Sequence, residues 1–360
     1  MLGFVLLNPT IPIMAGVRHH ILPRFLLKGF ASRIQGDGVF TLVYRKNKPP
    51  FETNIINIGT EKYFYGERGN VCADDVITSL ENEYAYMVEE LRDKEDQVEV
   101  SDKRIGEFVV HLFLRAKLLR NFFKNSMEYM TNAITEYFSD TENVKKYFKK
   151  HPDLIEEKIK KEYKNRSIPR QQRVMLTKKY KKMLPNLIEN HRQVFEDIRK
   201  YISEYAIKEI PKIVKNTHNT SLSEMPTSGL KVDRFKHLRW FVYKPAKQLI
   251  LGDAGCLYEM DGKKRFGVIY EEAKQIKNIF LPLSSHCMLA GVSSSESQFN
   301  FDVINEAIAR CSQEYFVCSL HSEDFLKLCA IIGEDAVILS NDELEQIVDE
   351  LMQSRVGIHK

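Results

Sequence analysis

The chain has 360 residues, of which 43% are hydrophobic and 28% are charged. This composition is typical of a globular protein with a full core, and it excludes the disordered and fibrous classes. The formal net charge is only +4, but the charge is unevenly distributed. Residues 144–216 hold 21 Lys/Arg against 9 Asp/Glu, a net of +12, so the remainder of the chain sums to −8.

The cysteines and the apolar segments limit the compartment and the cofactors. Six cysteines are scattered along the chain without a C-x-x-C pair. This pattern predicts free thiols in a reducing, cytoplasmic compartment and argues against structural zinc. No run approaches the roughly 18 apolar residues of a membrane span. Residues 1–17 are apolar but lack a basic start, so we interpret them as an N-terminal extension, with Met14 as an alternative start to Met1.

The N-terminal part is predicted to contain a short helix, two strands and two long helices. Pro23 suits the first turn of a helix and Gly29 suits its end. β-Branched and aromatic residues predict a strand at 39–44, and a second strand, its neighbour in the sheet, is predicted at 54–58 after two prolines. Apolar residues at helical spacing predict helices at 74–91 and 102–130. The second of these is apolar almost all round, which is typical of a central, buried helix.

A long basic helical hairpin is predicted in mid-chain, over residues 144–216. Between Lys158 and Lys182 there are 11 basic residues and one acid. Over Leu187–Tyr205 the apolar residues recur at spacings of three and four. This helix must therefore bury its apolar stripe against the rest of the protein or against a second copy. The segment 217–229, rich in Thr, Ser, Asn and Pro, is predicted to be a linker.

Strands return after this linker. Short apolar runs predict strands at 239–243, 248–251, 266–269, 278–281, 287–290 and 315–318, with a helix at 301–310. A last, acidic helix is predicted to begin at the capping box formed by Ser340 and Glu343.

Strands at both ends of the chain with helices between them predict an α+β fold. We expect a mixed β-sheet built from N- and C-terminal strands, around a central, mostly helical region that carries the basic hairpin. The expected segments are an N-terminal extension at 1–17, the two halves of the α+β core at 18–143 and 230–360, the basic insertion at 144–216 and the linker at 217–229. Two separate domains are the alternative.

Several segments resemble a known family. In chain order they are His20 to Ala31, Glu81, Arg115 with Arg120, Leu251 to Asp253, and Leu281 to Ser284. Together they resemble the bacterial family known as domain of unknown function 4238. The resemblance covers residues 18–130 and 236–330 and leaves the basic block outside. Gly252 and Gly255 stand where the family has Ser and Pro. The resemblance implies a fold-level grouping and a loose association with phage-defence and toxin-like proteins.

His20, Glu81 and Asp253 are the candidate catalytic residues. His20 precedes a predicted helix, where an imidazole can act as a general base; the alternative is a helix-entry histidine that caps the backbone. Asp253 follows a predicted strand between glycines, where the alternative is ordinary turn chemistry. If the three groups converge, carboxylates that hold Mg²⁺ or Mn²⁺ beside His20 would form a metal-dependent phosphodiesterase site.

Arg24, Arg115, Arg120 and His111 are the candidate anion-binding residues. Glu107, His111 and Arg115 are spaced four apart and so line one face of a helix. Guanidinium groups bind phosphate and carboxylate bidentately, which suits the wall of a cleft. The alternative is a solvent-facing stripe in which Glu107 and Arg115 each pair with His111.

The basic block supplies the candidate nucleic-acid-binding residues, which are Lys160, Lys161, Lys164, Arg166, Arg170, Arg173, Lys178 and Lys179. Tyrosines interleaved with this many basic residues are typical of contact with a phosphate backbone. The alternatives are a solvated helix face, an acidic membrane surface, or the chain's own acidic C-terminal part, which has 9 acids against 3 bases from Ser319 on.

These features give two hypotheses of different class. The first is an intracellular, nucleic-acid-directed protein, either a metal-dependent nuclease or a toxin- or defence-type effector. In it the basic hairpin binds RNA or DNA, and His20, Glu81, Arg115 and Asp253 line a cleft. The second is a non-catalytic binding or sensor module that forms a homodimer through Leu187–Tyr205.

Overall fold

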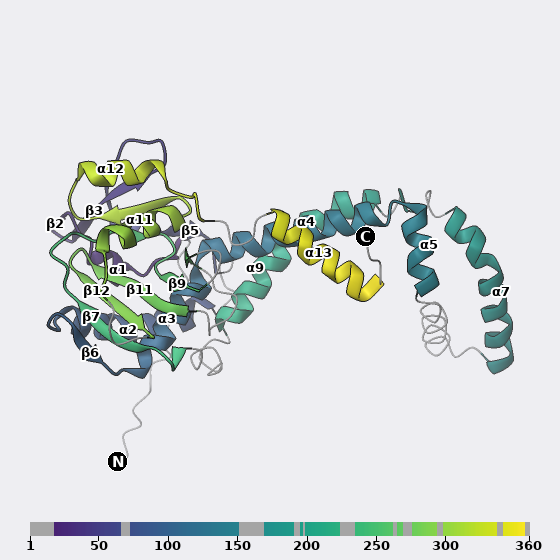
Figure 1. Cartoon of the computed structure of the whole chain (residues 1–360), viewed down its shortest axis with the longest axis horizontal. Coiled ribbons are helices and arrows are strands. Elements are labelled where there is room, and N and C mark those ends of the chain that lie inside the picture. Colours follow the sequence, from purple (N-terminus) through teal and green to yellow (C-terminus); the bar gives the residue numbers. More distant parts are fainter. Residues whose placement is uncertain are drawn as a thin grey trace, which may run out of the picture. The chain divides into compact units, whose positions relative to one another are not determined.

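The computed structural model describes residues 18–65, 73–150, 169–190, 195–196, 199–223, 235–261, 265–268, 276–293, 298–336 and 341–356 (Figure 1). The chain forms two compact units, which we describe separately. The first, the α+β unit, comprises residues 1–121 and 215–338. The second, the helical unit, comprises residues 122–214 and 339–360.

The α+β unit confirms the predicted fold class. In chain order its elements are β1 (Arg18–His20), α1 (Arg24–Lys28), β2 (Arg33–Gln35), β3 (Gly38–Arg45), β4 (Phe51–Asn54), η1 (Ile55–Asn57), β5 (Thr60–Lys62), α2 (Ala73–Arg92), β6 (Val98–Val100), α3 (Lys103–Arg115), β7 (Arg239–Tyr243), β8 (Leu251–Gly252), β9 (Leu257–Met260), β10 (Phe266–Gly267), β11 (Ile276–Ser284), β12 (Cys287–Val292), α11 (Phe301–Cys311), β13 (Tyr315–Cys318) and α12 (Glu323–Ala330). The helices α4 (Lys117–Tyr137) and α9 (Ile207–Ser223) each have one end in this unit.

The largest sheet has its strands in the order β10-β9-β11-β12-β7-β6. At its centre β11 pairs with β12, with Leu281 opposite Leu289. Every residue of β12 is buried, because helices cover the sheet: α1 and α2 contact β11, and α11 contacts β9 and β10. Burial of this kind explains why the strands are continuous apolar runs in the sequence.

The second sheet joins the two ends of the chain. Its order is β2-β3-β13-β8, and β4 pairs with β3. The buried strand β13 lies beside β3 with Val317 opposite Val43, and the rings of Tyr44 and Phe316 stack with centroids 4.9 Å apart. Helix α12 contacts β3, and α11 contacts both β8 and β13. Thus α11 lies between the two sheets and α12 covers the second (Figure 1).

Three antiparallel sheets replace the single mixed sheet expected from the sequence. Among the described residues the third sheet consists of β1 and β5, with His19 opposite Glu61. All ladders between the described strands are antiparallel. Short links explain the pairs of strands that are neighbours in the chain, such as β11 and β12, because a tight connection allows only an antiparallel pair. Pairs between distant segments, such as β3 with β13, are antiparallel as well, and no short link determines their direction.

Two predicted strands differ from the structure because side chains bind their backbone. The strand predicted at 54–58 is wrong in position: β4 occupies Phe51–Asn54, and the Asn54 side chain accepts a hydrogen bond from the Ile56 amide where the chain turns into η1. The strand expected at 248–251 is reduced to Leu251–Gly252. There the Asn305 side chain accepts from the Ile250 amide at 3.1 Å and donates to the Gln248 carbonyl at 2.8 Å.

The helix expected over 102–130 is broken at Ala116. Helix α3 ends at Arg115, Ala116 has φ −56° and ψ 126°, and α4 begins at Lys117. Neither Gly nor Pro marks this break, so the apolar pattern runs straight through it. The break places Arg115 inside the core and leaves Lys117 partly exposed.

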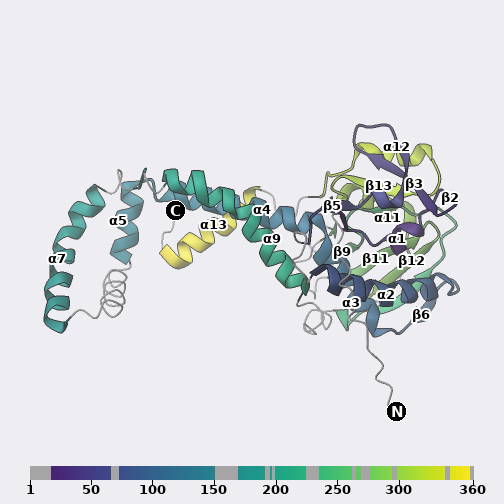
Figure 2. The ribbon, with the colours of Figure 1, turned by 180° about the vertical axis from the view of Figure 1, so that it is seen from behind.

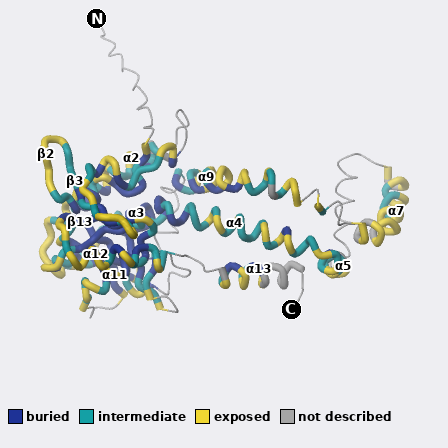
Figure 3. Tube along the Cα trace, turned by 90° about the horizontal axis from the view of Figure 1, so that it is seen from above, coloured by how far each residue is buried: buried dark blue, intermediate teal, exposed yellow. Residues whose placement is uncertain are grey.

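The helical unit consists of α5 (Thr141–Lys150), α7 (Arg170–Glu189), the π-helical turn η2 (Ile202–Ala206), α13 (Asn341–Val356) and the remaining parts of α4 and α9 (Figure 2). Helix α5 contacts both α7 and α13. Most of the described side chains in this unit are exposed or half-buried, whereas buried residues concentrate in the α+β unit (Figure 3).

The predicted segment boundaries are only partly covered by the described residues. The extension 1–17 and the first arm of the basic hairpin, 151–168, lie outside them. Helix α9 continues to Ser223, so the start of the segment expected as a linker, 217–229, is helical, and its remainder lies outside the described residues. The division into core halves and insertion stays a prediction.

Candidate functional site

A buried arginine organises the polar centre of the α+β unit. Arg115, the last residue of α3, is 1% exposed. Its Nε donates to the Tyr65 hydroxyl at 2.8 Å, and its Nη2 donates to the His20 carbonyl. Its Nη1 donates to a Glu81 carboxylate oxygen at 2.5 Å and lies 2.8 Å from His111 Nε2. We call these five residues the Arg115 cluster.

The Arg115 cluster is close to electrically neutral. The Glu81 carboxylate balances the charge of Arg115. Burial and the adjacent Arg115 lower the pKa of His111 well below 6.5. Since a guanidinium only donates, His111 accepts through Nε2 and its proton sits on Nδ1. Burial, followed by the charges of nearby arginines, lowers the pKa of His20 to about 4, so both imidazoles are neutral at pH 7.

The structure thus brings His20, Glu81, Arg115 and His111 into contact. His111 and Arg115 are 0% and 1% exposed, so the solvent-facing alternative is wrong. Four of the five guanidinium N–H groups of Arg115 already have partners within the cluster. An external phosphate would have to displace those partners, so the contacts support a structural role, and the catalytic and anion-binding roles stay predictions.

Within the described part of the chain, the other two candidate anion-binding arginines form no hydrogen bond or ion pair with the side chains of this cluster, although the charge of Arg24 contributes to the lowered pKa of His20. Arg120 donates to His218 Nδ1 at 3.0 Å, to the Phe64 carbonyl at 2.9 Å and to Asn219 Oδ1 at 2.9 Å. Its guanidinium carbon also lies 3.5 Å from the centroid of the Phe64 ring, and burial lowers the pKa of Arg120 to about 10. Arg24 is the exposed first residue of α1. Arg120 therefore fixes α9 against α4 within this unit.

Asp253 organises a turn rather than joining the Arg115 cluster. Its carboxylate accepts backbone N–H groups from Gln313 at 2.8 Å, Glu314 at 2.6 Å and Tyr315 at 3.3 Å. Burial raises the pKa of Asp253 to about 6, although the three amides oppose that shift. These contacts match the turn alternative, because the carboxylate holds the segment that leads into β13.

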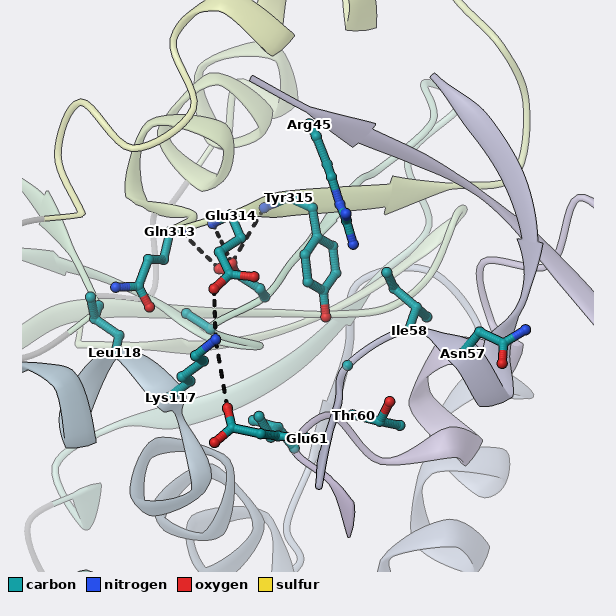
Figure 4. Close-up of a pocket in the computed structure, with 14 residues that line it drawn as sticks. Arg45, Asn57, Ile58, Thr60, Glu61, Lys117, Leu118, Gln313, Glu314 and Tyr315 are labelled. Atoms are coloured by element: carbon teal, nitrogen blue, oxygen red, sulfur yellow. Dashed lines mark hydrogen bonds and ion pairs between the residues drawn. The ribbon is translucent and has the colours of Figure 1, made fainter. Parts of the chain in front are cut away.

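A small pocket opens beside the break between α3 and α4 (Figure 4). We call it the Lys117 pocket; it is lined by Ile21, Arg45, Asn57, Ile58, Gly59, Thr60, Glu61, Lys117, Leu118, Asp253, Ala254, Gln313, Glu314 and Tyr315. Its volume of about 90 Å³ is well under the roughly 300–1,000 Å³ of pockets for drug-sized ligands. The pocket therefore suits a ligand of a few heavy atoms.

Opposite charges face one another across this pocket. The Lys117 ammonium lies 2.7 Å from Glu314 Oε1 and 3.6 Å from Glu61 Oε2. Arg45, the last residue of β3, has its guanidinium carbon 5.5 Å from the Phe51 ring centroid and 6.0 Å from that of Tyr315. The Nε of Arg45 is buried and has no hydrogen-bond partner among the residues that the structure describes.

Of the charged residues that line the Lys117 pocket, sequence reasoning singled out Asp253 and missed the others. Glu61, Arg45 and Glu314 lie in or beside short strands, and nothing in their spacing distinguishes them from surface charges. Lys117 lies two residues after Arg115. In a continuous helix Lys117 would lie on a different face from Arg115, whereas in the structure it is the first residue of α4. Only the break at Ala116 turns Lys117 toward this pocket.

The predicted nucleic-acid-binding residues are covered in part. Lys178 and Lys179 are exposed on α7, Arg173 is half-buried there, and Arg170 is the first residue of this helix. Lys160, Lys161, Lys164 and Arg166 lie outside the described residues. Across the described part of the chain, no group of three or more His, Cys, Asp or Glu side chains is placed to hold a metal ion. The expected Mg²⁺ or Mn²⁺ therefore stays a prediction.

Comparison with known proteins gives a family and no activity. A family model described as "protein of unknown function (DUF4238)" matches residues 18–336. The matched range runs through the basic block 144–216, which the sequence resemblance left outside. No curated protein and no solved structure is significantly similar to the chain. Among the helices that the structure describes, none is long and apolar enough to cross a membrane.

Proposed function

This chain belongs to the DUF4238 family of proteins of unknown function, and because that description carries no activity, we propose from its own surface charge that it binds nucleic acid along helix α7. The observation that carries the proposal is a group of exposed lysines, Lys178, Lys179 and Lys182, on that helix. The whole of α7 contains six Lys or Arg and one acid, Glu189, at its last residue.

The exposure of these lysines supports contact with a phosphate backbone. A lysine packed against its own protein cannot extend to a phosphate. These three lysines extend from a helix whose described residues are exposed on most sides, so their ammonium groups can contact a partner. Tyr180, between them, is 46% exposed and provides a ring on which an unpaired base can stack. A net charge of +12 over 144–216 adds attraction that does not depend on sequence.

Binding is the part of the nucleic-acid hypothesis that the described geometry supports best. The Arg115 guanidinium is engaged by its own cluster, and the Asp253 carboxylate is engaged by backbone amides. Metal-dependent cleavage, with a toxin- or defence-type role, remains a finer proposal. It requires His20 and Glu81 to act from within the Arg115 cluster, and it is tested by adding Mg²⁺ or Mn²⁺ to the binding experiment.

The test is salt-dependent binding of labelled single-stranded RNA and double-stranded DNA, measured by fluorescence anisotropy. Each phosphate contact contributes about 0.9 to the slope of log K against log salt for duplex DNA and about 0.7 for single strands. Replacing Lys178, Lys179 and Lys182 together with Gln should therefore reduce the slope by about 2–3 and weaken binding at low salt.

The matched control replaces Lys28, Lys46 and Lys48, three exposed lysines of the α+β unit, with Gln. This variant has the same net charge as the α7 variant, so it should bind as the unchanged protein does. Absence of salt-dependent binding by the unchanged protein contradicts the proposal, and so does equal weakening by the two variants.

Self-association through the segment Leu187–Tyr205 is a second candidate, supported by one observation. Tyr201 and Tyr205 are 63% and 58% exposed, and their rings stack with centroids 5.2 Å apart. Two large exposed rings at this spacing form a surface that a second copy can cover. Replacing both with Ser should shift a concentration-dependent dimer to monomer in light scattering. A chain that is monomeric at all concentrations contradicts this candidate.

A further inference from the structure

Arg45 is a half-buried charged side chain that contacts two aromatic rings but has no ion-pair partner among the described residues. Among the residues that the structure describes, no carboxylate pairs with its guanidinium, and its buried Nε has no hydrogen-bond acceptor. A buried donor left unsatisfied costs about 1–3 kcal/mol, and more when it is charged. Such groups in native proteins are usually explained by a ligand, an ion or a water.

The position of Arg45 favours a ligand. Its guanidinium lies beside the Tyr315 ring and points into the Lys117 pocket (Figure 4). Aromatic neighbours hold the planar group in one orientation, and this preorganises it for bidentate contact with a carboxylate or a phosphate. The Arg45 side of the pocket therefore recognises an anionic group.

The opposite side of the pocket carries excess negative charge. Glu61 and Glu314 share the single ammonium of Lys117. Asp253 adds a third carboxylate, whose lone pairs are largely used by backbone amides. The lining thus holds three carboxylates against two cations, so a free dianion is repelled there, whereas an ammonium group is attracted to Glu61 and Glu314.

We infer that the Lys117 pocket binds a small zwitterion, whose anionic group is held by Arg45 and whose ammonium group is held by Glu61 and Glu314. The pocket volume of about 90 Å³ limits the ligand to an amino acid with a short carbon chain. This site is independent of α7 and of nucleic acid binding, so either proposal can fail without the other.

The test uses isothermal titration calorimetry with a series of ω-amino acids: glycine, β-alanine and 4-aminobutyrate. Acetate, ethylamine and inorganic phosphate supply the anion alone, the cation alone and a dianion. A dissociation constant of about 1 mM corresponds to about −4 kcal/mol, which is within the ceiling of about −1.5 kcal/mol per heavy atom for ligands of this size. We expect at least one amino acid of the series to bind about ten-fold more tightly than acetate, ethylamine or phosphate.

Two variants identify the groups involved. Arg45→Gln should weaken binding of that amino acid at least about ten-fold, since it removes the bidentate contact. Glu61→Gln should weaken it too, and it provides a second route if the Arg45 variant does not fold. Arg33→Gln is the matched control, because Arg33 lies in the neighbouring strand β2 and pairs with Glu52 outside the pocket.

Three results overturn the inference. The first is that no amino acid of the series binds at concentrations up to about 20 mM. The second is that phosphate or acetate binds as tightly as the best amino acid, which makes this a simple anion site. The third is that folded Arg45→Gln and Glu61→Gln both bind as tightly as the Arg33→Gln control.

Discussion

Replacing Arg115 with Met tests whether the Arg115 cluster holds the α+β unit together. The substitution keeps an apolar stem of similar length but removes every donor. The Glu81 carboxylate then loses its partner, and the Tyr65 hydroxyl and His20 carbonyl lose theirs. Removing one member of a buried ion pair costs about 3–5 kcal/mol. Since the Glu81 side chain is 26% exposed and can turn to water, we expect a loss of about 3–4 kcal/mol.

The assay is urea unfolding followed by tryptophan fluorescence. The chain has one tryptophan, Trp240 in β7, so the signal reports on the α+β unit alone. A loss of about 3–4 kcal/mol is a large part of the 5–15 kcal/mol that stabilises a typical domain. Arg33→Met is the control, because Arg33 and its partner Glu52 are both partly exposed and such pairs contribute little.

A double-mutant cycle with Glu81→Gln separates the pair from the rest of the cluster. If Arg115 acts mainly through Glu81, the double variant should be little worse than Arg115→Met alone. A loss below about 1 kcal/mol in Arg115→Met would refute the reasoning, since it would mean that the buried guanidinium is not required for the fold. If Arg115→Met loses stability but still binds nucleic acid, the result agrees with a structural role of Arg115.

Three further predictions concern half-buried titratable groups. The folded pKa of Asp253, about 6, lies above 3.8 because of burial, so its titration makes the free energy of unfolding fall as pH rises from about 4 to 6. Asp253→Asn should lose that part of the pH dependence in urea unfolding series. The folded pKa of His20, about 4, lies below 6.5 because of burial and nearby arginines, so its contribution to stability is lost as pH falls from about 6.5 to 4. In NMR titrations its ring signals should stay unchanged between about pH 8 and 5.5, and a midpoint near 6.5 would contradict this. Arg120→Leu should lower the free energy of unfolding by about 2–3 kcal/mol, because it leaves His218 Nδ1 and the Phe64 carbonyl without donors; an unchanged unfolding midpoint would exclude that role.

The sequence predicts best those elements whose local signals agree with their packing. The strand expected at 315–318 is β13 to the residue, and the helix expected at 301–310 is α11, Phe301–Cys311. Helix α11 has a local start signal, since the Asn300 side chain accepts from the amides of Asp302 and Val303. A buried run of aromatic and β-branched residues leaves β13 no competing local structure.

Prediction from the sequence fails where a side chain far away in the chain determines the backbone conformation. The Asn305 side chain satisfies the backbone of Gln248 and Ile250, so these residues need no strand partner. That contact joins residues 55 and 57 positions apart, and no local pattern contains it. The break at Ala116 is hidden for the same reason, because apolar residues continue on both sides of it.

The candidate site shows the same limit. The helix pattern correctly singled out Arg115 as a charged residue among apolar ones, and such a residue needs partners. It could not show that those partners are Glu81 and the Tyr65 hydroxyl from two other segments. Apart from Asp253, the Lys117 pocket was beyond sequence reasoning, since its charged residues come from β3, β5, the turn after β8, α4 and the loop before β13.

The sheet that joins β3 to β13 also sets the order in which the chain can fold during synthesis. The Thr41 hydroxyl donates to the carbonyl of Cys318, 277 residues later. At about 5–20 residues per second, a ribosome needs roughly 15–55 s to make that stretch. Until then β3 has an unpaired edge, and this favours aggregation or chaperone binding. Residues 122–214, by contrast, are complete before the last strand of the α+β unit leaves the ribosome.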